Sequence, residues 1–208
     1  MKKIRFDDCI CHSNLKGHSL IKDRILDEIE KDPVEEFGFK KSDSYLSDDI
    51  FKLDHRISEM GYEGPDKSEI SVDRKWVDIF LPHFTESLES IMHSMGYLGL
   101  NLHQVWYQQY LRDNYHGWHI HQLHFTGVYY LEFPKGSADT IICSPYDLKP
   151  KKINVKEGDI IVFPGHWIHR APPNTSERKT IVSFNFDAHM DQINVKAIKK
   201  STPWWKIM

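Results

Sequence analysis

The sequence predicts a mainly antiparallel β domain, a sandwich or jelly roll, with helices along its flank. From Leu98 onward, short apolar or alternating runs are separated by turn signals built from Gly, Pro and Asp, whereas the preceding part reads as helix and irregular structure. Short strands at such spacing are typical of these two architectures. The predicted strands cover residues 101–111, 119–122, 126–133, 140–143, 151–155, 159–163 and 180–186.

The chain length of 208 residues suits one well-buried core, and we expect a single domain. Residues 1–100 would form a helical and irregular flank, 101–190 the jelly-roll core and 191–208 a tail packed on that core. Apolar residues at helical spacing predict helices over 19–31 and about 73–94, with Pro82 as a candidate kink in the second. Residues 33–65 are rich in charge and are expected to be loop with short turns.

Composition narrows the classes of partner. The chain carries 27 Lys and Arg against 30 Asp and Glu, a formal net charge of −3, so it lacks the positive excess of a dedicated nucleic-acid binder. No apolar run approaches the roughly 20 residues that cross a bilayer, and the charged N-terminal residues do not form a secretory signal. The three cysteines fit reduced thiols, and Cys9-Ile10-Cys11-His12 is interpreted as ordinary packing rather than a zinc site. We therefore expect a cytoplasmic protein with no membrane partner.

The sharpest chemical signal is a run of four histidines within nine positions, at 116, 119, 121 and 124. In an extended strand alternate side chains share a face, so His119 and His121 would point the same way and could hold one metal ion. A second element, residues 158–169, combines a Gly-Asp turn, a buried strand, a Pro-Gly corner and His169 just beyond it. A jelly roll can bring these parts together. Three neutral imidazoles on a divalent ion leave positions open for substrate and dioxygen, as non-haem Fe(II) chemistry requires.

The strand after His169 begins with two basic residues. Arg178 lies at the start of an otherwise apolar strand, and a guanidinium at the inner end of an apolar pocket needs an anion such as a carboxylate. Lys179 is the rival anchor, because neighbours on a strand face opposite sides. We favour Arg178 on its interval of nine residues from His169.

At these motifs the sequence resembles the Fe(II)- and 2-oxoglutarate-dependent oxygenases, in particular the small bacterial and phage-type branch with a prolyl-hydroxylase-like core. The resemblance covers roughly residues 101–186. Besides the histidines, it includes Gly-Val-Tyr-Tyr-Leu at 127–131 and Ser-Phe-Asn at 183–185. It implies a double-stranded β-helix, the cupin-like form of the jelly roll.

The resemblance also implies an activity. Fe(II), 2-oxoglutarate and dioxygen would be used to hydroxylate a C–H bond of a second substrate, with release of succinate and CO2. It makes His119 and His169 metal ligands and Arg178 the anchor for the distal carboxylate of 2-oxoglutarate. Tyr130 matches a tyrosine that reaches the same carboxylate in prolyl hydroxylases.

The third ligand departs from the pattern of that family, which has His-X-Asp or His-X-Glu where this chain has His119-Ile120-His121. We take His121 as the third ligand. Two alternatives stay open: a carboxylate such as Asp139 or Asp187 completes the site, or His124 replaces His121. Four other histidines of the β region are interpreted as non-ligands: His103, His116, His166 and His189. Of these, His116 and His166 are candidates for lining the entrance to the site.

Each of the other residues near the predicted site has two possible roles. Trp106, Gln108 and Tyr110 alternate on one face of a strand that enters the site, where they either line the pocket or pack in the core. Ser183 and Asn185 either contact 2-oxoglutarate or satisfy backbone groups.

Two rival functions follow from the same residues. A cupin-type three-histidine dioxygenase needs no 2-oxoglutarate; the extra histidine favours it, while Arg178 and Tyr130 argue against it. A catalytically silent jelly-roll binding module would use the histidines for zinc or for nothing. The sequence indicates neither the second substrate nor the oligomeric state.

Overall fold

A computed structural model describes residues 9–31, 58–59, 75–146 and 148–189 of the chain. Most of the loop expected over 33–65 and the whole tail expected over 191–208 lie outside these residues. Among the helices that are described, none is both long and apolar enough to cross a membrane.

Apart from the short strands β1 and β2, which lie before α1 and α3, the described helices precede the strands, as the sequence predicts. The helices are α1 (His18–Lys31) and α3 (Lys75–Ser94). The strands are β1 (Cys11–Asn14), β2 (Ser58–Glu59), β3 (Gly99–Leu111), β4 (His116–His119), β5 (Phe125–Glu132), β6 (Ile141–Cys143), β7 (Pro150–Lys152), β8 (Asp159–Pro164), β9 (Ile168–Ala171) and β10 (Arg178–His189).

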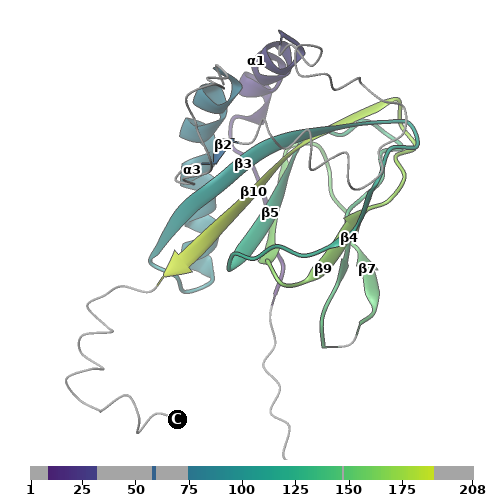
Figure 1. Cartoon of the computed structure of the whole chain (residues 1–208). Coiled ribbons are helices and arrows are strands. Elements are labelled where there is room, and N and C mark those ends of the chain that lie inside the picture. Colours follow the sequence, from purple (N-terminus) through teal and green to yellow (C-terminus); the bar gives the residue numbers. More distant parts are fainter. Residues whose placement is uncertain (1–8, 32–57, 60–74, 147, 190–208) are drawn as a thin grey trace, which may run out of the picture.

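The strands form two antiparallel sheets. The larger has the order β1-β8-β5-β10-β3-β2 and the smaller the order β4-β9-β6-β7. Figure 1 shows β4, β9 and β7 set to one side of the larger sheet, with α1 and α3 on its other side. This interleaving of chain-distant strands into two facing sheets is the jelly roll that the sequence predicts.

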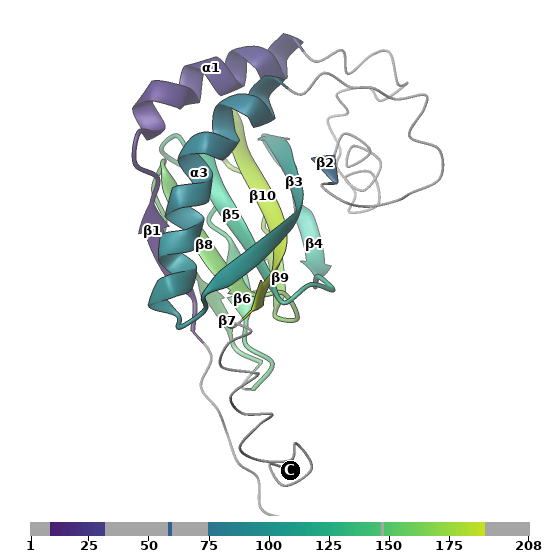
Figure 2. The same cartoon turned by 90° about the vertical axis from the view of Figure 1, so that its left-hand side faces the viewer.

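Helices α1 and α3 cover the outer face of the larger sheet (Figure 2). Each buries one apolar stripe, as an amphipathic helix does, and α3 continues through Pro82 as one helix. Phe80 of α3 stacks on Phe84 at 4.5 Å and on Tyr129 of β5 at 5.4 Å between ring centroids. These contacts fasten the helical flank to the sheet and leave the other face of that sheet for the site.

The larger sheet therefore separates two cores. Val182 and Phe184 of β10 belong to the core under the helices, whereas Ile181 belongs to the core between the sheets. Because side chains alternate along a strand, Lys179 and Ser183 share the inner face with Ile181. Both faces of β10 are buried along most of its length.

Each predicted strand has an observed counterpart, with shifted ends. The largest correction is at 119–122, where the strand instead covers His116–His119 and the chain bends through 122–124. Three strands were not predicted: β1, β2 and β9. Each is only two to four residues long, too short for alternation to be read with confidence from the sequence.

Candidate metal centre

Strands β4 and β9 carry His119 and His169, the two histidines predicted as metal ligands without an alternative. They pair antiparallel, and His119 lies directly opposite His169. Their ring centroids are 4.1 Å apart. Side chains directly opposite on a strand pair share one face, so the backbone pairing alone brings the two imidazoles together.

His121 reaches the same place from the bend after β4 rather than from a strand. Its backbone N–H donates to the carbonyl of Gly165 at 2.8 Å, and the N–H of Gly165 donates to the carbonyl of His124 at 2.9 Å. A side chain at position 165 would collide with the carbonyl oxygen of Leu123, so only glycine allows this approach. The Pro-Gly corner thus positions His121 as well as His169.

The three histidines form a compact cluster. One ring nitrogen from each of His119, His121 and His169 lies within 4.8 Å of the others. Nε2 of His121 and Nε2 of His169 are 3.2 Å apart. Nitrogens this close can bind one ion between them, at the bond lengths of about 2 Å that imidazole makes with divalent metals.

Hydrogen bonds from the far side of two rings fix which nitrogen faces the cluster. Nδ1 of His119 lies 2.8 Å from the carbonyl oxygen of Gly117, and Nδ1 of His169 lies 2.9 Å from that of Trp167. A carbonyl only accepts, so Nδ1–H must donate, which leaves the Nε2 lone pair for a metal. This arrangement is the usual support of a metal-binding histidine.

Burial keeps the cluster uncharged. Removal from water lowers the pKa of His119, lowers the pKa of His121 to about 3 and holds the pKa of His169 well below its usual range. His116 is stacked on His119 with ring centroids 3.9 Å apart, and burial lowers its pKa to about 3 as well. Neutral imidazole is the form that binds a metal.

Neither of the two carboxylates named as alternatives, Asp139 and Asp187, joins the cluster of His119, His121 and His169. Asp187 contacts His103 at 3.1 Å and His124 at 3.4 Å, and Asp139 pairs with Lys152 at 2.7 Å. The side chain of His124 is 64% exposed. Among the residues that the structure describes, the group that could bind a metal contains three histidines and no Asp or Glu.

Arg178 does not face the site, contrary to the expectation from the sequence. Its guanidinium makes two hydrogen bonds to the carboxylate of Glu132, at 2.8 and 2.9 Å, and a third to Glu30 of α1 at 2.8 Å. These acceptors raise its pKa above the ordinary value. Strand alternation turns residue 178 toward the helices, and a role for Arg178 as the anchor for 2-oxoglutarate stays a prediction.

Lys179 is a cation on the inner face of β10. It is 1% exposed, its Nζ donates to the carbonyl of Ala138 at 2.9 Å, and it lies 4.5 Å from the ring centroid of Tyr110. Burial lowers its pKa to about 8, partly offset by the nearby charge of Asp139. A buried ammonium without a carboxylate bonded to it is costly, and an anionic ligand would remove that cost.

Tyr130 lies at the same end of the space between the sheets as Lys179. It is fully buried, and its hydroxyl lies 2.7 Å from Oγ1 of Thr140. Burial raises its pKa, so the phenol stays protonated and able to donate. Thr140 was not singled out from the sequence, because a lone threonine at a strand end carries no signal of its own.

The other side chains predicted to line the pocket or to contact 2-oxoglutarate lie on the inner face of β3 and β10. The ring of Trp106 lies 5.9 Å from that of His121, measured between centroids. Ser183 donates to the side chain of Gln108 at 3.2 Å, and Asn185 donates to that of Gln104 at 2.6 Å. A pocket-lining role for Trp106 and Gln108, and contact of Ser183 and Asn185 with 2-oxoglutarate, stay predictions.

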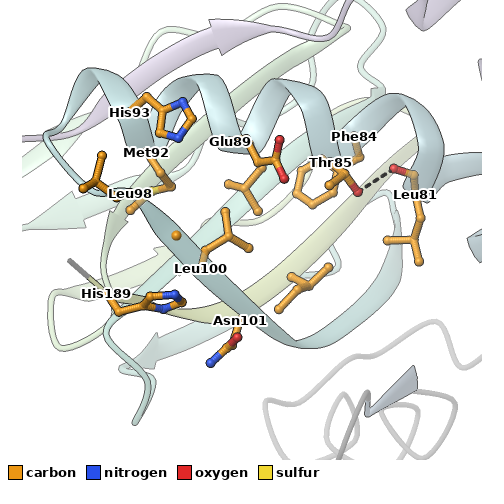
Figure 3. A pocket seen from close by; sticks show the side chains of 13 residues that line it. Leu81, Phe84, Thr85, Glu89, Met92, His93, Leu98, Leu100, Asn101 and His189 are labelled. Atoms are coloured by element: carbon orange, nitrogen blue, oxygen red, sulfur yellow. Dashed lines mark hydrogen bonds between the residues drawn. The ribbon is translucent and has the colours of Figure 1, made fainter. Parts of the chain in front are cut away.

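A separate groove of about 690 Å³ lies between α3 and the start of β3 (Figure 3). Its lining is mostly apolar, with Glu89, His93 and His189 among the polar members. It belongs to the helical side of the larger sheet and includes none of the three clustered histidines.

Together, the fold and the cluster define a double-stranded β-helix with a three-histidine candidate metal centre between its sheets. The same fold is found in solved oxygenase structures. A prolyl-4-hydroxylase from Pseudomonas putida matches with a TM-score of 0.51 at 12% identity, over 86% of this chain and 88% of that one. A Trichoplax adhaerens prolyl hydroxylase, solved with a peptide fragment of the hypoxia-inducible-factor oxygen degradation domain, matches with 0.51 at 14% identity, over 86% and 83%.

A third match is to a 2-oxoglutarate-Fe(II) oxygenase family member from Burkholderia pseudomallei. It covers 51% of this chain and 56% of that one, with a TM-score of 0.43 at 16% identity. No family model and no curated protein matches the sequence. The two matches with a TM-score of 0.51 confirm the predicted fold.

Proposed function

We propose that the protein is an Fe(II)- and 2-oxoglutarate-dependent dioxygenase that hydroxylates a C–H bond of a second substrate and releases succinate and CO2. One observation carries the proposal: a buried lysine faces the same interior as a cluster of three neutral histidines. A metal centre and a cation for a dicarboxylate are the two binding functions that this chemistry requires of the protein.

The residues present fit an iron ion. His119 and His169 each direct an Nε2 lone pair into the cluster because their Nδ1–H groups are held by carbonyls. Three imidazoles would leave positions open for 2-oxoglutarate and dioxygen. Bound iron would supply the oxidation chemistry, as cofactors generally do.

The protein's own residues would bind and orient the cosubstrate. Lys179 replaces Arg178 in this proposal as the partner of the distal carboxylate, since its ammonium is buried and points inward. Tyr130, with its proton held by the raised pKa, would donate a second hydrogen bond to the same carboxylate. The apolar core between the sheets, which includes Phe163 and Ile181, would exclude water from the reacting groups.

One observation favours the cupin-type alternative. The third member of the cluster is a histidine, and within the described ranges no carboxylate accompanies it. A three-histidine dioxygenase that binds substrate directly would need neither Lys179 nor 2-oxoglutarate.

Anaerobic titration separates the proposals. Fe(II) followed by 2-oxoglutarate should give a visible charge-transfer absorption in the wild type and none in His169→Ala. His166→Ala, which removes an exposed histidine outside the cluster, is the matched control and should retain the absorption.

Iron binding without any response to 2-oxoglutarate would support the cupin-type reading. A protein that binds no iron would remove both enzyme proposals and leave the silent binding module.

A further inference from the structure

The inner wall made by β3 and β10 is lined by neutral polar side chains around one tryptophan. Gln104 lies opposite Asn185 and Trp106 opposite Ser183, with Gln108 next along β3. Ser183 and Asn185 use the amides of Gln108 and Gln104 as acceptors. We name these five residues the amide wall.

Two buried polar atoms of the amide wall have no hydrogen-bond partner among the residues that the structure describes. They are Nε1 of Trp106, in a side chain that is 6% exposed, and Oδ1 of Asn185, which is 5% exposed. Native proteins pair nearly all such atoms, because a buried polar atom without a partner destabilises the fold. Two unpaired polar atoms on adjacent strands of the amide wall indicate a ligand that forms hydrogen bonds with both.

The position of the wall ties it to the metal centre. The indole of Trp106 lies against His121, with ring centroids 5.9 Å apart. The inward-facing cation, Lys179, lies four residues from Ser183 along β10, about 13 Å at the rise of a strand. An anion is therefore attracted to the far end of the interior, and the wall beside His121 carries no charge of its own.

The chemistry of the two atoms limits what they bind. An indole nitrogen only donates, so Trp106 requires an acceptor. Asn185 offers an unpaired acceptor, or an unpaired donor if its amide and that of Gln104 turn over together with their hydrogen bond kept. A neutral amide satisfies both cases because it both accepts and donates, whereas a carboxylate only accepts.

We propose that the amide wall binds the second substrate through a neutral amide group, which accepts a hydrogen bond from Trp106 and pairs with Asn185. The inference rests on the proposed function, since it names the substrate class of that same site. It assigns Trp106 as a substrate-binding residue and predicts that amide-bearing substrates, such as peptides or carboxamides, are selected over anionic ones.

The test follows the indole N–H itself, in metal-free protein. Protein labelled with 15N at its six tryptophans is titrated with N-methylacetamide and, separately, with sodium acetate. N-methylacetamide should shift the Trp106 indole resonance downfield in a saturable way, and acetate should not. The indole of Trp118, which is 45% exposed and stacks with Arg170, serves as the internal control and should not move.

Two variants sharpen the measurement. Trp106→Phe identifies the resonance by its loss; if that variant does not fold, the through-space contact of the indole with the His121 ring identifies it in the wild type. Asn185→Leu should raise the dissociation constant for N-methylacetamide about fivefold, the effect of one net hydrogen bond.

An unshifted Trp106 resonance, or an equal shift with acetate, would overturn the proposal. Because the titration uses neither iron nor 2-oxoglutarate, its outcome is independent of whether the protein binds them. A failure here and a failure of the dioxygenase proposal are thereby told apart.

Discussion

Adjacent basic residues on β10 experience opposite environments. Arg178 faces the helices, is bound by two carboxylates and has a raised pKa, whereas Lys179 faces the interior, bonds to a carbonyl and has a pKa lowered to about 8. The first charge is fully compensated by the protein and the second is not. Which basic residue is available to a ligand is thus decided by the face of the strand, and a one-residue difference separates a structural ion pair from a candidate binding group.

The largest expected difference between these two residues is in cosubstrate binding. Lys179→Ala should weaken 2-oxoglutarate binding by two to three orders of magnitude, because loss of a buried charge partner costs about 3–5 kcal/mol. Arg178→Ala should change it by less than about threefold, since it removes only a charge on the far face. Anaerobic calorimetry with Fe(II) present measures both. Equal losses in the two variants would contradict the comparison.

The next effect is on stability, and it has a defined pH range. The folded pKa of Lys179 is about 8 against 10.5 ordinarily, so between these values the unfolded chain binds more protons and the wild type gains stability as pH rises. Lys179→Met, free of a buried charge, should be more stable than the wild type at pH 7 by up to about 3 kcal/mol. The advantage should shrink from pH 8 to 10.5 in denaturant unfolding of metal-free protein. A constant difference across that range would mean that the ammonium is not strained by burial.

The smallest effect concerns Arg178 itself. Arg178→Met should lower the free energy of unfolding by about 1 kcal/mol, because it leaves Glu132 without its bidentate partner at a partly exposed site. High salt should reduce the loss, since it screens the ion pair in the wild type. Unfolding midpoints at low and high salt check this, and a stabilised variant would count against the assignment of Arg178 as a structural residue.

Long apolar runs made the fold readable from the sequence. Strands β5, β8 and β10 carry such runs between turn residues, and their positions were predicted to within a few residues. Strand β9, which presents His169, was missed because only four residues of it pair and the Pro-Gly corner obscures its start. The clustered histidines could nevertheless be predicted, because histidine is a metal-ligating residue type and its position in the sequence does not depend on the local backbone.

The orientation of β10 was harder to read. A strand buried on one face shows alternation of apolar and polar residues, but β10 is buried on both faces, so the sequence around 178 and 179 contained no sign of which residue points inward. The same limit applies to His121, which reaches the cluster through a bend held by Gly165 and not through strand alternation. Tertiary contacts, and not the local sequence, determine both the direction of residues 178 and 179 and the position of His121.

The pairing of β4 with β9 also determines when the candidate metal centre can form during synthesis of the chain. His121 and His169 are 48 positions apart, so the emerging chain has no three-histidine site until β9 has been made and has closed that long loop onto β4. A metal ion held by all three histidines would then bind only after β9 has paired with β4.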